Sequence, residues 1–229
     1  MNPFKTVLYE KWNDLAVVTL NRPKMINALN VQMRDDLWEI LSAVREDEGV
    51  RGLLICGAGD RGFCSGADLT EFGSAPSQAI AREVRRMRDL WTLLLALPKP
   101  TMAAIHGYCF GSGMEIAALC DLRMGAANSM FAMPEVGLGL VPAAGGTQSL
   151  ARIMGTPRAM DMVLTGRRID AEEARNFGFL DWIAPTDNLP RDALSILDSV
   201  VMSCRADVFA AAKRAVSEGV EMTLPDALR

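Results

Sequence analysis

The stretch GLLICGAGDRGFCSGADL, residues 52–69, decides whether the chain has a dinucleotide-binding fold. Its apolar beginning is typical of a buried strand, and residues 57–62 then supply the pattern G-x-G-x-x-G. A dinucleotide-binding site needs the third glycine of this pattern to open a helix, with an acidic residue about 20 positions later at a strand end. Here Gly66, Gly73 and Pro76 interrupt any such helix. The stretch therefore predicts a loop that approaches something closely through its backbone, not a redox-cofactor site.

The composition indicates an ordinary globular protein. The chain has 229 residues, of which 50% are hydrophobic and 23% charged, with a formal net charge of -4. Its basic residues are scattered, so neither nucleic acid nor a membrane surface is an expected partner. The densest basic cluster, REVRRMR at residues 82–88, fits the solvated face of an amphipathic helix better than a contact with an anionic cofactor tail.

Cysteine usage and apolar runs bear on location. The five cysteines show no CxxC or Cys/His spacing, and no signal peptide precedes them. These features predict a cytoplasmic location and no metal site. No apolar stretch reaches the length of a membrane span.

Alternating strand and helix patterns predict the α/β class. Strands are expected at residues 15–20, 52–56 and 101–107, with short strands and turns at 121–138. Helices are expected from Val31 to a stop at Gly49, over 78–97, and after a Ser112 cap. The rest is predicted to be mostly helical, at 157–164, 171–177, 191–201 and 207–218. We therefore expect a core domain at 1–156 and a helical C-terminal region at 157–229.

Four segments, in order, together resemble the enoyl-CoA hydratase/isomerase (crotonase) family. They are NRPKMINALN (21–30), RGFCSGADL (61–69), IHGYCFGSGMEIAALCDLRM (105–124) and FAMPEVGLGLVPAAGGTQSL (131–150). The similarity continues through residues 164–183. The resemblance implies a spiral of repeated β-β-α units with a helical C-terminal appendage. It also implies a homotrimer or a dimer of trimers, and no cofactor besides the coenzyme A that the substrate carries.

The resemblance assigns an oxyanion hole to two backbone amides. An acyl thioester needs its carbonyl polarised before water can add to the adjacent double bond, and two fixed N–H groups can do this. The matching amides are those of Ala67 and Ser112. Ser112 stands where the family usually has glycine, and a plain N-cap is a compatible alternative for it.

Glu115 and Glu135 match the family's two catalytic glutamates. Alone, each would be unremarkable, because a first-turn Glu compensates a helix dipole and Pro-Glu often begins a turn. Within the matched motifs, the resemblance implies that Glu135 delivers a proton to the α-carbon while Glu115 holds and helps to deprotonate water. Several isomerases that resemble these enzymes keep only the carboxylate matching Glu135. The pair therefore favours hydration over isomerisation.

The resemblance also implies a set of residues that contact coenzyme A or the substrate. They are Lys24, Met25, Ile26, Ala28, Gly66, Asp68, Leu69, Gly111 and Ala143. Thr70 stands where relatives often carry Lys, and Ala143 replaces a commoner glycine. Relatives commonly extend beyond the helix at 206–218 by another helical segment, so we expect either a short protein or a further tail, and this bears on coenzyme A contacts from a neighbouring subunit.

The sequence thus predicts a lyase of fatty acid metabolism that adds water reversibly to a 2-enoyl-CoA, giving a 3-hydroxyacyl-CoA. The first alternative is an enoyl-CoA isomerase or another enolate-forming enzyme with a branched or cyclic acyl-CoA. A non-catalytic acyl-CoA-binding subunit is the second. His106 is expected to be a structural hydrogen-bonding residue, and Cys64 and Cys109 are expected to be small packing residues.

Overall fold

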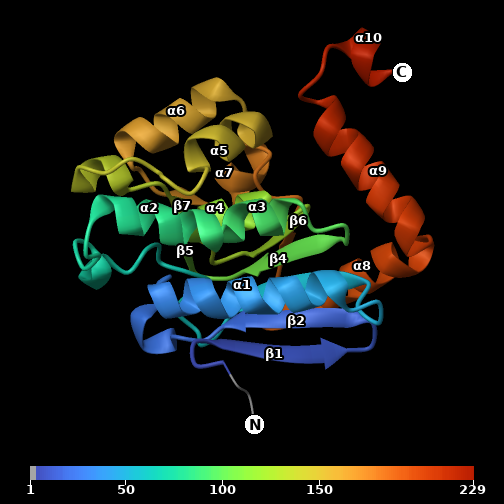
Figure 1. Ribbon diagram of the computed structural model, residues 1–229, viewed down its shortest axis with the longest axis horizontal. Coiled ribbons are helices and arrows are strands. Elements are labelled where there is room, and N and C mark those ends of the chain that lie inside the picture. Colours follow the sequence, from blue (N-terminus) through green and yellow to red (C-terminus); the bar gives the residue numbers. More distant parts are fainter. Residues whose placement is uncertain (1–3) are drawn as a thin grey trace.

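The computed structural model describes residues 4–229, and a six-stranded sheet runs through the centre of that part (Figure 1). The strand order is β1-β2-β3-β4-β6-β9; β1 pairs with β2 antiparallel and the other pairs are parallel. The strands are β1 (Val7–Trp12), β2 (Leu15–Leu20), β3 (Gly52–Gly57), β4 (Thr101–Ile105), β6 (Leu122–Ala126) and β9 (Trp182–Ala184). The central parallel strands are buried on both faces, which explains their nearly continuous apolar sequences.

A smaller sheet lies beside the first and contains β5 (Tyr108–Phe110), β7 (Met130–Ala132) and β8 (Ile169–Asp170). Strands β4 and β5 follow each other directly, as do β6 and β7, so each such pair contributes one strand to each sheet. Isolated bridges join Gly62 to Gly107 and Cys64 to Cys109, which places residues 62–64 alongside β5. The predicted α/β class and the spiral of repeated β-β-α units are confirmed.

Helices cover both faces of the large sheet (Figure 1). One face packs on α8, through an apolar stripe formed by Ala193, Leu197 and Val201. The other face belongs to the main core, which α1, α3 and α4 help to close. The helices are α1 (Val31–Glu46), α2 (Gln78–Met87), α3 (Leu90–Leu95), α4 (Ser112–Leu119), α5 (Gly146–Met154), α6 (Thr156–Thr165), α7 (Ala171–Asn176), α8 (Leu189–Ser203), α9 (Ala206–Gly219) and α10 (Leu224–Ala227). Short 3-10 helices are η1 (Pro23–Met25), η2 (Leu69–Glu71), η3 (Glu135–Leu138) and η4 (Thr186–Asn188).

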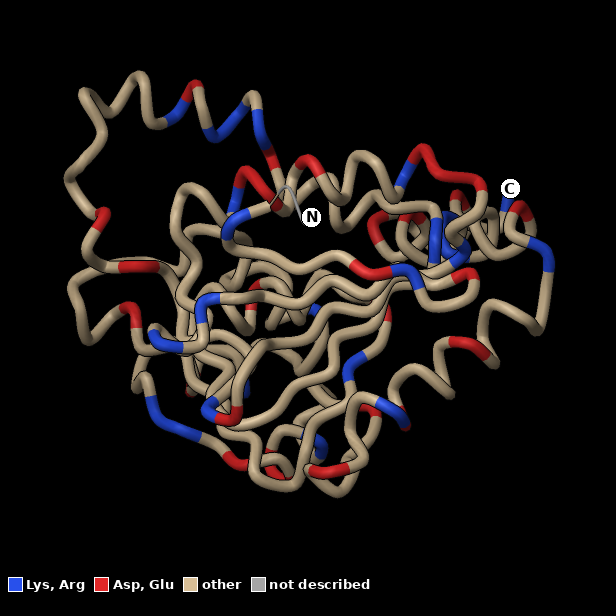
Figure 2. The backbone as a smooth tube through the Cα atoms, turned by 90° about the horizontal axis from the view of Figure 1, so that it is seen from below, with Lys and Arg blue, Asp and Glu red and all other residues tan. Residues whose placement is uncertain are grey.

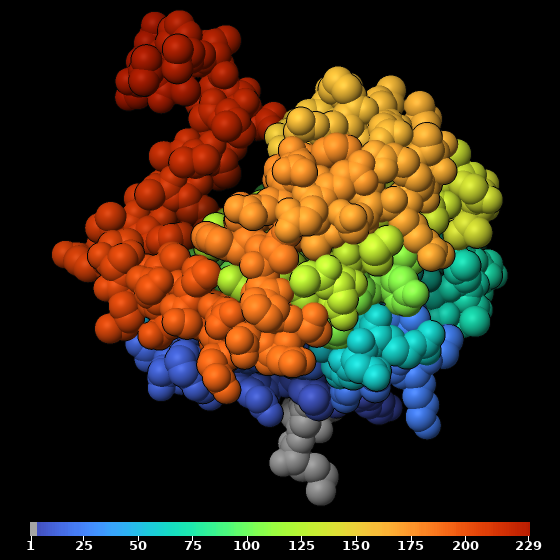
Figure 3. Space-filling model, turned by 180° about the vertical axis from the view of Figure 1, so that it is seen from behind, coloured from blue at the N-terminus to red at the C-terminus, as the bar shows by residue number. Residues whose placement is uncertain are grey.

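Helices α9 and α10 form an arm that projects from the rest of the molecule (Figures 1 and 3). Neither helix has a buried residue. Ion pairs attach the arm to the core, at 2.8 Å between Lys213 and Asp121 and at 2.8 Å between Arg152 and Glu221. Between the arm and helices α3, α4 and α5 lies a cavity of about 840 Å³.

Two predictions of local structure are wrong. The single helix expected at 78–97 is two helices, because Asp89 caps α3 by accepting hydrogen bonds from the N–H and hydroxyl of Thr92 at 3.1 and 2.6 Å. Ser112 is not an N-cap: Gly111 holds that position, without a side-chain hydrogen bond, and Ser112 is the first residue of α4. The sequence patterns also missed β1, β5, β8, β9, α5 and α10.

Charged residues of both signs are dispersed along the chain (Figure 2). Within residues 4–229 no helix is long and apolar enough to cross a membrane. The same residues contain no group of three or more His, Cys, Asp or Glu side chains placed to hold a metal ion.

Candidate active site

Two segments that are distant in sequence are joined by backbone hydrogen bonds at the site. The N–H of Leu29 donates to Gly66 at 2.8 Å, and the N–H of Asp68 donates to Leu29 at 2.9 Å. Ser65 donates to Ile26 at 2.9 Å. The segments at 21–30 and 61–69, which both carry predicted site residues, therefore form one surface.

The start of α4 lies against this surface. A Cβ on Gly113 would lie only 2.5 Å from the carbonyl oxygen of Cys64, so the glycine permits the close approach. Gly111 has φ +48° and ψ -118°, which L side chains rarely adopt, and its hypothetical Cβ would be 3.7 Å from the Cα of Gly66. The backbone at 66–67 and the first residues of α4 are thus brought together.

Two backbone N–H groups are available at this junction. In the part of the chain that the structure describes, neither Ala67 nor Ser112 donates its N–H to a protein acceptor. Ser112 opens α4, where the helix dipole adds a partial positive charge. Two free donors beside a helix N-terminus can stabilise an oxygen that becomes negatively charged.

Glu115 is buried and firmly held. Its side chain lies in the first turn of α4, and the residue is 1% exposed. One carboxylate oxygen, Oε1, accepts hydrogen bonds from the N–H groups of Ala144 and Gly146, both at 2.9 Å. The donors lie in the turn before α5 and at the first residue of α5, so the position of this side chain depends on that junction.

Glu135 has a different environment at the start of η3. It is half-buried, and its Oε2 is enclosed without a hydrogen-bond partner among the described residues. Burial raises the pKa of the Glu135 carboxyl above its ordinary value, and the nearby charge of Glu115 raises it further. A hypothetical Cβ on Gly111 would be 2.6 Å from Oε1 of Glu135, so this carboxyl also lies at the start of α4. The site thus contains one carboxyl group held by two N–H donors and one whose pKa is raised above its ordinary value.

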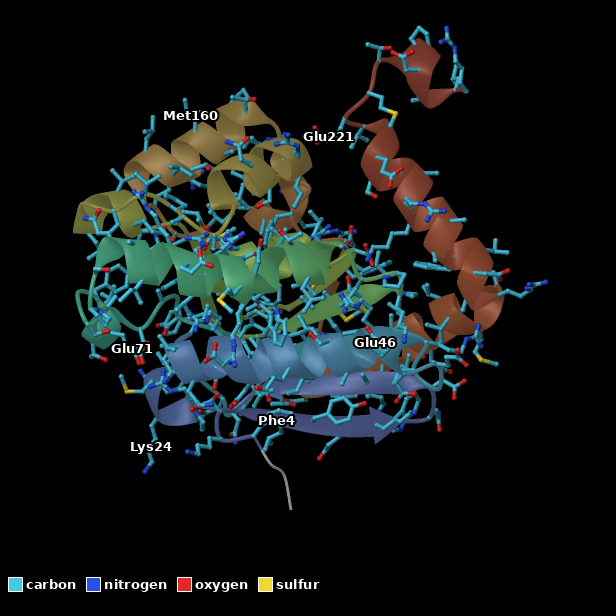
Figure 4. All side chains as sticks on the ribbon, viewed as in Figure 1. Phe4, Lys24, Glu46, Glu71, Met160 and Glu221 are labelled. Carbon is cyan, nitrogen blue, oxygen red and sulfur yellow. The ribbon has the colours of Figure 1, made fainter. Side chains whose placement is uncertain are left out.

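Of the residues expected to contact coenzyme A, some are exposed and others are buried. Lys24, Met25 and Leu69 are exposed, and Figure 4 shows the Lys24 side chain pointing away from the body of the molecule. Ala28 and Asp68 are buried. Their polar groups are used internally, because Arg22 donates to the Ala28 carbonyl at 2.6 Å and pairs with Asp68 at 2.8 Å.

Asp68 also binds Thr70, the residue that stands where relatives often carry Lys. Its carboxylate accepts hydrogen bonds from the Thr70 N–H at 3.2 Å and the Thr70 hydroxyl at 2.6 Å. These hydrogen bonds hold the pKa of the Asp68 carboxyl below its usual range, and Arg22 lowers it further. Thr70 therefore stabilises the loop that follows Ala67 and carries no charge for a phosphate.

Sequence reasoning missed the residues that fix the site's backbone. Buried Asn27 has φ +54° and donates to the carbonyls of Ala58 and Gly62, both at 2.9 Å. An Asn in a turn-like motif is the one available signal for such a conformation. Ala143 was expected at the site, but the donors to Glu115 are its neighbours Ala144 and Gly146, which no side-chain pattern distinguishes.

His106 and the cysteines lie outside this chemistry. Burial lowers the pKa of His106, and its Nε2 has no hydrogen-bond partner among the described residues. Cys64 and Cys109 are fully buried, and burial raises the pKa of Cys64 to about 11. Neither thiol favours the reactive thiolate form, in agreement with the predicted packing role.

Comparisons with known proteins agree with one another. A model of the family described as enoyl-CoA hydratase/isomerase matches residues 10–229. A mitochondrial enoyl-CoA hydratase from Pongo abelii is 35% identical over 226 residues, covering 97% of this chain and 77% of that protein. A crotonyl-CoA hydratase from Syntrophomonas wolfei is 34% identical, covering 98% and 86%.

Solved structures give the same picture. The crystal structure of an enoyl-CoA hydratase from Bacillus anthracis matches with a TM-score of 0.92 and 31% identity. The match covers 98% of this chain and 87% of that one.

Proposed function

Because the chain belongs to the enoyl-CoA hydratase/isomerase family, we propose that it is a lyase that hydrates a 2-enoyl-CoA to a 3-hydroxyacyl-CoA. The observation that carries this proposal is the pair of glutamates in contrasting environments, Glu115 bonded to two N–H groups and Glu135 with an unpartnered oxygen among the described residues. Relatives from Pongo abelii and Syntrophomonas wolfei are named as hydratases of enoyl-CoA and crotonyl-CoA.

The free N–H groups of Ala67 and Ser112 form the oxyanion hole in this proposal. They bind the thioester oxygen, whose negative charge grows as water adds to the β-carbon. The helix dipole of α4 acts in the same direction. Each donor is a backbone group, so serine in place of the family's usual glycine leaves the function of residue 112 intact.

The two carboxyl groups divide the proton transfers. Glu115 is the base: its Oε1 is held by two N–H groups, and its carboxylate orients water and takes its proton as oxygen attacks the β-carbon. Glu135 is the acid, because burial and the neighbouring carboxylate raise its pKa and favour a proton that can pass to the α-carbon. One proton leaves water for Glu115 and one passes from Glu135 to the α-carbon, and proton exchange with solvent returns both carboxyl groups to their starting state.

Coenzyme A is bound as part of the substrate. In the proposal it lies along the surface formed by residues 24–28 and 66–69, where exposed Met25 and Leu69 contact its pantetheine and Lys24 lies near the nucleotide end. Gly66, Gly111 and Ala143 approach the acyl group through their backbone. The fatty acid pathway and a cytoplasmic location belong to the same proposal, the latter supported by five free cysteines.

Assembly as a trimer or a dimer of trimers is also proposed, and the arm supports it. Exposed apolar residues run along α9 and α10, among them Val216, Val220 and Leu224, which are 69 to 71% exposed. A neighbouring copy that packs on this face would bury them. Light scattering of the purified protein tests the assembly directly, and a monomer at micromolar concentration would refute it.

The hydratase activity is tested with crotonyl-CoA. Addition of the protein should remove the absorbance of the conjugated thioester and yield 3-hydroxybutyryl-CoA by mass spectrometry. Glu135→Gln should lower the rate by roughly 10²- to 10⁴-fold, the usual contribution of a general acid. Failure of the wild type with straight-chain, branched and cyclic 2-enoyl-CoA would refute hydration. Conversion of a 3-enoyl-CoA to its 2-enoyl isomer without hydration would establish the isomerase alternative.

A further inference from the structure

The hold on Glu115 depends on two peptide groups of one turn. The N–H of Ala144 shares its peptide group with the carbonyl of Ala143, and the N–H of Gly146 shares its own with the carbonyl of Gly145. Both N–H groups donate to Oε1 of Glu115 at 2.9 Å. A group that binds either carbonyl oxygen therefore acts on the Glu115 carboxylate through one intervening peptide group.

The carbonyl of Gly145 is bound by the first turn of α5. It accepts hydrogen bonds from the N–H groups of Gln148 and Ser149 at 2.9 and 2.8 Å. The hydroxyl of Ser149 donates to it as well, at 3.0 Å. The carbonyl side of this peptide is thus fixed by neutral groups of α5, while its N–H donates to Glu115.

The carbonyl of Ala143 has a charged partner from a distant element. The guanidinium of Arg85, on α2, donates to it. Two other arginines of the cluster are engaged elsewhere, since Arg86 pairs with Glu83 at 2.8 Å and Arg88 pairs with Asp35 at 3.0 Å. Arg82 lines a hollow beside this turn but makes no hydrogen bond to the turn among the described residues. Arg85 is therefore the member of the basic cluster at 82–88 for which a contact with this turn is seen.

A chain of hydrogen bonds runs from a positive to a negative group through this peptide. It passes from the Arg85 guanidinium to the Ala143 carbonyl, and from the Ala144 N–H to the Glu115 carboxylate. A cation at the carbonyl oxygen polarises the peptide and makes its N–H a stronger donor. We infer that Arg85 is a positioning residue that strengthens the hold on the Glu115 carboxylate through the Ala143–Ala144 peptide.

Through Arg85, helix α2 contributes to the geometry of the turn before α5, although few of its side chains pack against the core. Helix α2 has no buried residue, and a hollow of about 400 Å³ separates part of it from the turn. Arg85 spans from this exposed helix to the turn, so the turn's geometry depends on where α2 lies. Because Arg85 is exposed, salt should weaken the effect.

The kinetic test rests on the proposed function and compares neighbouring arginines. Arg85→Met should lower kcat for crotonyl-CoA by about three- to tenfold with little change in KM, because the base is held less firmly once substrate is bound. Arg85→Lys should recover most of the loss, and Arg86→Met, the matched control, should behave as wild type. In a Glu115→Gln background the effect of Arg85→Met should vanish. An equal loss in both backgrounds, or wild-type kcat in Arg85→Met, would overturn the inference.

A second measurement does not depend on turnover. In protein labelled with ¹⁵N-alanine, the Ala144 amide proton should move upfield in Arg85→Met, because its hydrogen bond weakens, and stay in place in Arg86→Met. An unchanged Ala144 resonance would refute the inference even if the protein is an active hydratase. A shifted resonance in a protein that hydrates no enoyl-CoA would support the relay and refute only the hydratase function.

Discussion

Two regions of the molecule each place one glutamate in the same site, and the surroundings of the two side chains differ. The first region is the start of α4 with the turn before α5, and the second is the start of η3. At the first, Glu115 is 1% exposed and two N–H groups hold one of its oxygens. At the second, Glu135 is half-buried with Oε2 unpartnered among the described residues, and burial raises its pKa. The two carboxyl groups thus differ in their hydrogen-bond donors as well as in their burial.

The difference lies in the backbone donors. Hydrogen bonds from N–H groups favour the charged form of a carboxyl, whereas enclosure without donors favours the neutral form. Two identical side chains can therefore serve as base and acid at one pH, as hydration of a double bond requires. Changes that disturb one environment and spare the other test whether this contrast is functional.

The largest expected effect comes from displacing Glu135. Gly111→Ala would place a methyl group 2.6 Å from its Oε1 and force an L residue to φ +48°. A carboxyl displaced by about 1 Å can cost roughly 10²-fold in rate, so kcat for crotonyl-CoA should fall by about that factor. Gly137→Ala, in η3 with nothing within 4 Å of the new methyl, is the control and should retain activity. Wild-type activity in Gly111→Ala would contradict the placement of Glu135.

A smaller effect is expected at the turn that holds Glu115. In Gly146→Ala the new methyl would lie 2.9 Å from Oε1 of Glu115 and 2.7 Å from the flexible end of Met133. Because the Met133 side chain can move and the Gly146 N–H is retained, we expect kcat to fall by about tenfold. The measurement is a kcat and KM determination beside Gly137→Ala. A larger fall in kcat than in Gly111→Ala would contradict the expectation that disturbing Glu135 costs more activity than disturbing Glu115.

The smallest expected effect is a change in melting temperature when Glu135 is replaced, and this change depends on pH. The folded-state pKa of Glu135 is raised above its ordinary 4.5, so ionisation of this group lowers stability as pH rises through that window. Glu135→Gln should therefore raise the melting temperature at pH 7 by about 2–4 °C, and by less at pH 4, where both states are protonated. Glu48→Gln, at an exposed position, should show no such difference. A Glu135→Gln protein that is less stable at pH 7 than at pH 4, relative to wild type, would contradict the raised pKa.

Sequence reasoning reached the fold and family because ordered motifs match the β-β-α units around the site. It placed Glu115 in a helix first turn, as found, and Glu135 in a loop after Pro134, where the structure has the start of the 3-10 helix η3. It could not identify Ala144 and Gly146 as donors, because every residue except proline has a backbone N–H and only the fold aims it. The break at Asp89 was missed because the apolar spacing continues across it, while the cap depends on Thr92 three residues later.

The most direct measurement of the division of roles is α-proton exchange. Butyryl-CoA has no double bond, so in D₂O the enzyme can only remove and return its α-proton, a step that uses the oxyanion hole and Glu135 without attacking water. Glu115→Gln should lower hydration of crotonyl-CoA by roughly 10²- to 10⁴-fold, leaving a measurable rate, but keep most of the deuterium incorporation into butyryl-CoA, measured by mass spectrometry. Glu135→Gln should lose both. Equal loss of exchange in the two variants, or exchange that survives in Glu135→Gln, would contradict the account.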